Sequence, residues 1–90
     1  MNEAKQKTIV NFRKAHSLLS SIIKMIEEDR YCIDIMQQNL AAIGLLKSAH
    51  QTLMEGHLGS CFAAAVASKN ERRKKEMISE ILRVTKLANK

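Results

Sequence analysis

The stretch DRYCIDIMQQNLAAIGLLKSAHQTLMEGHLGSCFAAAVA, residues 29–67, decides the architecture. Apolar side chains recur along it at intervals of three and four residues, which predicts one long helix. Its three glycines weaken that helix by about 1 kcal/mol each without ending it. Thirty-nine residues at ~1.5 Å each span roughly 58 Å, whereas a compact domain of this size has a radius of gyration of only ~12 Å. We therefore expect other protomers to bury the apolar face, in a homo-oligomeric bundle that begins with an antiparallel dimer.

A shorter helix is predicted on each side of the long one. Residues 3–28 carry an apolar stripe at helical spacing, and a third helix extends to about Ala88. Ser68, followed three residues later by Glu71, predicts a capping box at the start of that third helix. The fold class is therefore all-α, a three-helix protomer with a long second helix, in a single domain of residues 1–90.

The composition supports this fold and narrows the function. The chain has no proline or tryptophan, and 46% of its residues are apolar but only 3% are aromatic, which is typical of helices. We expect a cytoplasmic protein without a membrane partner, because the longest apolar runs are far short of a span and the first residues do not resemble a signal peptide. Thiols stay reduced in that compartment, so two cysteines indicate a metal or redox role. The alternative is two buried cysteines that act as small apolar residues.

The candidate ligands are Cys32, His57 and Cys61. His57 and Cys61 are four residues apart, so they share one face of a helix. Cys32 lies 25 residues before His57, roughly 37 Å away along a straight helix. An antiparallel partner that crosses near Leu45 and Leu46 would bring Cys32 of one chain to His57 and Cys61 of the other, giving two sites per dimer. Two thiolates and an imidazole suit Cu(I), or Zn(II) with a fourth ligand; the alternative is that these positions are apolar core.

The net charge is +6, and residues 69–90 carry eight basic but only three acidic groups. A basic small protein often binds nucleic acid. The shortage of aromatic side chains argues against single-stranded partners, which require base stacking. The run Arg72–Lys75 has a simpler interpretation as a solvated helix start, although four cations there oppose the helix dipole.

The segment KMIEEDRYCIDIMQQ, followed at this distance by HLGSC, resembles the copper-sensing operon repressor family of CsoR/RcnR-like metal-sensitive repressors. The resemblance covers nearly the whole chain from about Arg13. It implies a helical bundle of dimers and dimers of dimers, a homotetramer, that represses transcription by binding double-stranded operator DNA and releases it when an inducer binds. Cys32, His57 and Cys61 match the copper-sensor ligands. Tyr31 matches a position that supports them, and a glutamate of the third helix, Glu76 or Glu80, is expected to do the same.

Together the charge pattern and the resemblance indicate a repressor, not an enzyme, that binds DNA as the apo-protein and dissociates from it on binding Cu(I). Two alternatives remain. One is a persulfide sensor in which Cys32 and Cys61 are modified by sulfur without a metal, and the other is a metal-binding member of the family that has lost DNA binding. The second arises because KAHSLLSSI, residues 14–22, departs from the family's usual RIEGQVRGI. The DNA contacts are expected among Lys5, Lys7, Arg13, Lys14, Arg72, Arg73, Lys74 and Lys75.

Overall fold

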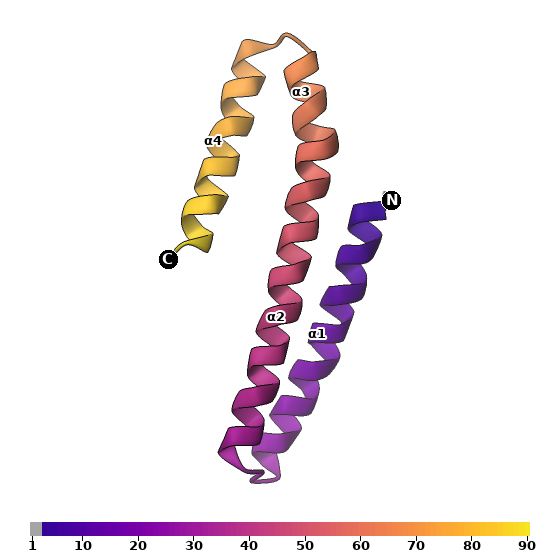
Figure 1. Ribbon diagram of the computed structural model, residues 1–90, viewed down its shortest axis with the longest axis vertical. Helices are drawn as coiled ribbons and strands as arrows, with labels where there is room; N and C mark the ends of the chain where they lie inside the picture. The colour runs from indigo at the N-terminus through magenta and orange to yellow at the C-terminus, as the bar shows by residue number, and fades with distance from the viewer. Residues whose placement is uncertain (1–2) are drawn as a thin grey trace. The chain divides into compact units, whose positions relative to one another are not determined.

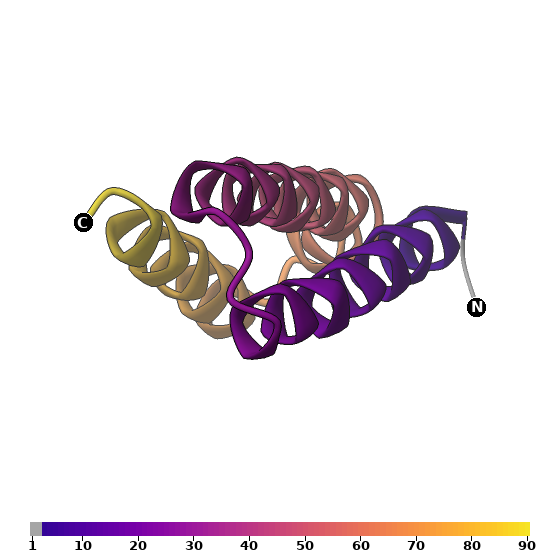
Figure 2. The same cartoon turned by 90° about the horizontal axis from the view of Figure 1, so that it is seen from below.

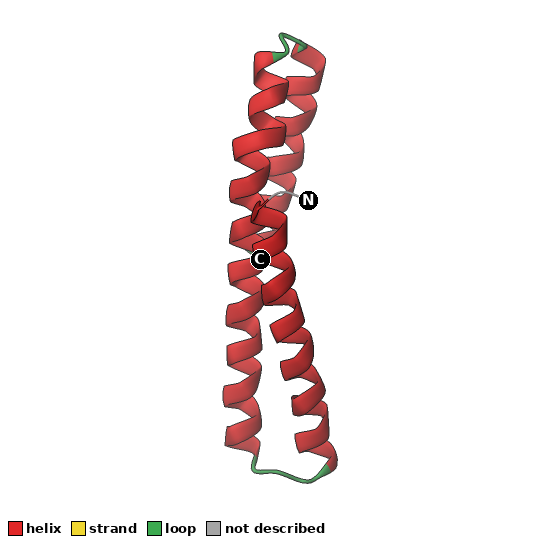
Figure 3. Ribbon diagram, turned by 90° about the vertical axis from the view of Figure 1, so that its right-hand side faces the viewer, coloured by secondary structure: helices red, strands yellow, loops and turns green. Residues whose placement is uncertain are grey.

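The computed structural model describes residues 3–90, and every secondary-structure element in that range is helical (Figures 1 and 3). Two short turns divide the helices into three stretches, which confirms the predicted all-α class. The middle stretch is helical from end to end but changes its hydrogen-bonding pattern, because a π-helix interrupts it. In chain order the elements are α1 (Glu3–Glu27), α2 (Cys32–Gly56), the π-helix η1 (His57–Phe62), α3 (Ala63–Ala67) and α4 (Glu71–Ala88).

The first of two compact units ends at Glu55 and contains α1 and most of α2, which form an antiparallel hairpin (Figure 2). Small side chains are buried along it at intervals of seven residues: Thr8 and Ala15 on α1, and Ala42 and Ala49 on α2. A seven-residue interval returns to nearly the same face of a helix, so these residues form a continuous seam. The buried Thr8 hydroxyl is satisfied, since it donates to the Ala4 carbonyl at 2.7 Å.

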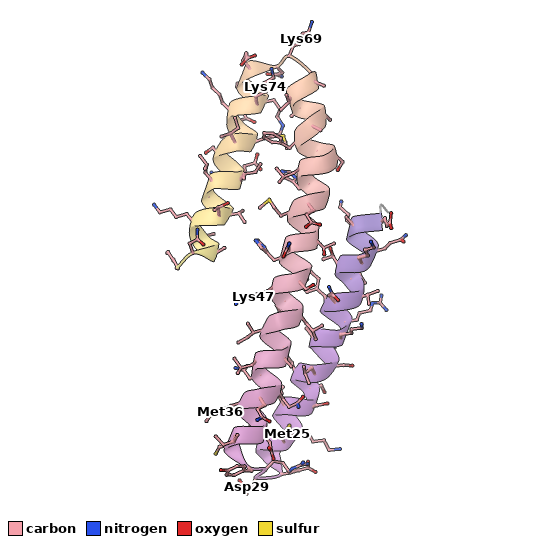
Figure 4. The ribbon with its side chains drawn as sticks, viewed as in Figure 1. Met25, Asp29, Met36, Lys47, Lys69 and Lys74 are labelled. Carbon is pink, nitrogen blue, oxygen red and sulfur yellow. The ribbon has the colours of Figure 1, made fainter. Side chains whose placement is uncertain are left out.

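The turn between α1 and α2 is a Schellman motif. Asp29 has a positive φ of 54°, its amide donates to Ile26 O at 3.1 Å, and the Arg30 amide donates to Met25 O at 2.9 Å. These two bonds satisfy carbonyls that the end of α1 would otherwise leave without partners. The motif ends α1 at Glu27 and reverses the chain at Asp29 (Figure 4).

The second unit, Gly56–Lys90, contains η1, α3 and α4. Ala65 and Met77 are its buried apolar residues. The expected capping box at Ser68 is wrong. Ser68 is still helical (φ −71°, ψ −14°) and caps the end of α3, whereas Asn70 is extended (φ −86°, ψ 98°) and its side chain accepts from the Arg73 amide at 3.1 Å. An N-cap has non-helical, usually extended geometry. Lys69, with φ 63°, turns the chain after α3, and Asn70 then has the extended conformation that an N-cap requires.

The described residues bury few large side chains. The buried apolar set consists of Ile22, Met77 and four alanines. Many large apolar side chains are exposed instead, including Phe12, Met36 and Leu40, at 43%, 56% and 65%. Apolar surface of this extent on a small chain is typical of an interaction surface. None of the helices in residues 3–90 combines the length and apolar character that crossing a bilayer requires.

Candidate metal centre and basic surfaces

Two of the three predicted ligands lie in the π-helix η1, which begins at His57 and includes Cys61. The segment follows Gly56 and contains Gly59, and glycine is a weak helix former, so the α pattern is least stable here. In a π-helix the backbone bonds join residues five apart instead of four, and such single turns occur frequently at functional sites. His57 is half-buried and Cys61 is exposed. One helical turn therefore carries an imidazole and a thiol four positions apart.

The third predicted ligand, Cys32, is the first residue of α2 and belongs to the other unit. Both cysteine side chains are free thiols and both are exposed. Tyr31, the proposed supporting residue, is 69% exposed. Within residues 3–90 of one chain, no three His, Cys, Asp or Glu side chains lie together as a metal site.

The basic run at the start of α4 is largely paired with acidic side chains of the same helix. Arg72 Nε lies 3.3 Å from Glu76 Oε1, and Arg73 Nη1 lies 3.2 Å from Glu76 Oε2 and 3.5 Å from Glu80 Oε1. Lys74 Nζ lies 3.2 Å from Glu71 Oε1. These pairs are exposed to solvent, where each stabilises by at most about 1 kcal/mol. They offset only part of the conflict between the cations and the helix dipole, because Arg72, Arg73 and Lys74 have acidic partners on the same helix.

The cations of α1 lie on a face away from the buried seam. Arg13 and Lys14 line a shallow depression together with Ser17 and Ser21. At about 100° per residue, this face is opposite the one that carries Thr8 and Ala15. The other predicted contacts on α1 are exposed, and Lys7 pairs with Glu3 at 3.5 Å.

Comparison with known sequences assigns the chain to a family. Residues 4–86, almost the entire chain, match the family described as metal-sensitive transcriptional repressors. The chain belongs to this family. Its members are transcriptional repressors and not enzymes, which confirms the corresponding expectation.

Individual relatives in the metal-sensitive repressor family are described as copper sensors. The chain is 35% identical over 66 residues to the copper-sensing transcriptional repressor CsoR of Mycobacterium ulcerans, covering 73% of this chain and 56% of that protein. It is 40% identical over 55 residues to RicR of Mycobacterium tuberculosis, covering 61% and 57%. It is 34% identical over 74 residues to CsoR of Bacillus subtilis, covering 82% and 70%. The chain thus spans little more than half the length of the mycobacterial relatives.

Sequence reasoning overlooked Ser60, the residue directly before Cys61 in the π-helix. Its hydroxyl donates to the Gly56 carbonyl at 2.7 Å and lies 3.8 Å from the Cys61 sulfur. The available signal was a hydroxyl residue directly before a ligand in a glycine-containing turn. His50, seven residues before His57 on the same helical stretch, is exposed in the single chain.

Proposed function

We propose that this protein is a copper-responsive repressor that binds operator DNA as the apo-protein and dissociates from it when Cu(I) binds. The observation that carries the proposal is the pairing of His57 and Cys61 on one π-turn, together with an exposed free thiol at Cys32. The copper-sensing relatives support the choice of metal. Residues 1–90 would then act as one metal-sensing and DNA-binding domain.

The donor set fits a soft, monovalent metal. Cys32 of one protomer and His57 and Cys61 of its partner would hold the ion, giving two thiolates and one neutral imidazole, which are ligands that Cu(I) prefers. The metal would supply a bond between two chains that is absent from the apo-protein. Zn(II) would need a fourth ligand, because it is usually four-coordinate in proteins.

Assembly with further copies of the chain is part of the proposal. Met36, Leu40 and Ile43 are exposed on α2, and helical spacing places Met36 and Ile43 on the same face as Cys32. A second copy that covered this face in antiparallel orientation would bury apolar surface and bring each Cys32 toward the partner's η1. We infer an antiparallel dimer and a dimer of dimers, as the resemblance implies.

Contacts with DNA would come from the cations of α1 and α4. Arg13 and Lys14 lie beside serine hydroxyls on an exposed face, and both side-chain types bind phosphates. On α4, Arg72, Arg73 and Lys74 would exchange carboxylate partners for phosphates, whereas no ion pair involves Lys75 among the described residues. Phosphate contacts give affinity and salt dependence without selecting a base sequence.

Repression and release require only a modest coupling between the metal and DNA sites. A 100-fold loss of DNA affinity corresponds to about 2.7 kcal/mol, well within the usual range of allosteric coupling. Glu76 and Glu80 are both engaged by Arg73. If either carboxylate moved to support a metal ligand, the charge available to DNA at Arg73 would change with it.

The exposure of both thiols favours one second candidate, a sensor of reactive sulfur. Cys32 and Cys61 are free and accessible, so a persulfide donor could join them across two chains through sulfur, with no metal. The altered α1 segment, residues 14–22, supports a third interpretation in which the protein binds metal but not DNA.

The decisive experiment is fluorescence anisotropy with a duplex from the protein's own promoter, with and without stoichiometric Cu(I), under anaerobic conditions. We expect tight apo binding that Cu(I) weakens about 100-fold. Cys32→Ala and His57→Ala should bind DNA as the wild type does but no longer respond to Cu(I). His50→Ala, on the same helical stretch, is the matched control and should respond normally.

Each other outcome selects an alternative. A DNA complex that is insensitive to Cu(I) but dissociates on addition of a persulfide donor would identify the sulfur sensor. An apo-protein that binds copper but no duplex at low salt would leave only the metal-binding interpretation.

A further inference from the structure

The Ser60 hydroxyl has two acceptors within reach but only one proton to donate. It donates to Gly56 O at 2.7 Å, while the Cys61 sulfur lies 3.8 Å away, within the longer range of hydrogen bonds to sulfur. The first contact has the usual length of a bond between a hydroxyl and a carbonyl, and the second is long. In this arrangement the Ser60 proton therefore points to the Gly56 carbonyl.

The Gly56 carbonyl lies at the junction between α2 and η1. In an uninterrupted α-helix it would accept from the Ser60 amide, four residues later. The Ser60 hydroxyl bonds to this carbonyl across the junction, as the Thr52 hydroxyl bonds to Ser48 O within α2. The bond therefore ties Ser60, in the turn that carries His57 and Cys61, to the last residue of α2.

We propose that Ser60 is a positioning residue of the metal site. Its hydroxyl ties η1 to Gly56 and would donate its hydrogen bond to the Cys61 sulfur when that sulfur binds a soft metal ion. On ligation the Cys61 thiol gives its proton to solvent and the sulfur becomes an anionic ligand. Ser60 keeps its own proton and only rotates its hydroxyl, so the Gly56 carbonyl is released. This inference rests on the proposed metal site.

The Ser60 hydroxyl is expected to turn from Gly56 O toward the Cys61 sulfur because the ligating sulfur is the stronger acceptor of the two. A thiolate carries a formal charge, and hydrogen bonds to charged acceptors are roughly twice as strong as neutral ones. Groups that hydrogen-bond to metal ligands orient them, and removing such a group typically lowers metal affinity 10- to 100-fold. Because Ser60 is exposed and its present distance to sulfur is long, we expect a change at the lower end, about tenfold.

The test compares Ser60→Ala with Ser60→Thr, which retains a hydroxyl that can bond to a carbonyl four residues earlier. Thr52→Ala is the matched control, because the Thr52 hydroxyl makes the same type of bond to Ser48 O at 3.0 Å on α2, away from the thiol. Cu(I) affinity is measured anaerobically by competition with a chromophoric chelator. The thiolate-to-copper absorption band gives a second measurement that reports the hydrogen bond at sulfur.

We expect Ser60→Ala to weaken Cu(I) binding about tenfold and to shift the band, with Ser60→Thr close to the wild type and Thr52→Ala unchanged. Amide hydrogen exchange in the metal-free protein should become faster across residues 57–62 in Ser60→Ala only. If Ser60→Ala binds Cu(I) like the wild type, or if Ser60→Thr is equally impaired, the positioning role is wrong. Cys61→Ser tests the metal site independently of the role of Ser60. If it does not weaken Cu(I) binding, the metal site itself fails.

Discussion

The N-terminus of α4 provides a sharp test of the structure, because the sequence and the structure place its cap at different residues. In the structure the Asn70 side chain accepts from the Arg73 amide at 3.1 Å. Replacing a capping Asn by Ala typically costs about 1 kcal/mol, and the cost is not reduced here because four consecutive cations oppose the dipole at this end. For a chain of this length, 1 kcal/mol lowers Tm by roughly 4–8 °C.

Asn70→Ala should therefore lower Tm by about that amount, measured by circular dichroism at a fixed protomer concentration, since assembly makes Tm concentration-dependent. Asn70→Asp retains the acceptor and adds a negative charge near the helix N-terminus, so it should be neutral or stabilising. Ser68→Ala removes the bond from Ser68 Oγ to Ala65 O (2.6 Å) and the long bond from the Asn70 amide to Ser68 Oγ (3.3 Å). It should cost less, about 0.5 kcal/mol, because neither bond serves an amide within the first turn of α4. The reversed order, with Ser68→Ala the more damaging, would refute the assignment of Asn70 as the cap.

Three further predictions concern the first unit. Asp29→Gly should stabilise the protein by about 0.5–1 kcal/mol in chemical denaturation, because glycine adopts the positive φ of 54° at this position without strain; a loss of stability would show that the Asp29 side chain is needed in the turn. Leu40→Glu, at a position 65% exposed in the single chain, should leave helicity intact but reduce the assembly in analytical ultracentrifugation, and an unchanged sedimentation coefficient would exclude this face of α2 from the interface. Arg13→Ala should reduce the slope of log affinity for duplex DNA against log salt by about 0.9 for each phosphate that Arg13 neutralises, whereas an unchanged slope would place Arg13 outside the DNA surface.

The prediction of the helices from sequence succeeded where the signal was local. Apolar spacing and composition were sufficient for three helical stretches, and their observed ends lie within a few residues of those expected. The prediction of the α4 cap was wrong because Ser68 and Asn70 are both good capping residues and lie close together. The choice between them depended on the backbone of Lys69, whose positive φ is not evident from its residue type.

Some features of the candidate site could likewise be predicted from the sequence, and others could not. The sequence alone was enough to propose Cys32, His57 and Cys61, because ligand chemistry and a four-residue interval are local properties. Nothing in that spacing distinguishes an α-turn from a π-turn, since the difference lies in which carbonyl each amide selects. The role of Ser60 and the pairing of Arg73 with Glu76 and Glu80 were likewise hidden, because they depend on side-chain conformations.

The sequence by itself therefore determined the helical class and the family, which follow from residue types and their intervals, and it was enough to propose the soft donor atoms. Only the tertiary structure decided where α4 begins, that the turn carrying His57 and Cys61 is a π-helix, and which cations of α4 are already paired. The physical reason is that hydrogen-bond acceptors and ion-pair partners compete for the same groups. Each of these features is a choice between acceptors or partners of similar strength, and that choice is made by the geometry of the folded backbone.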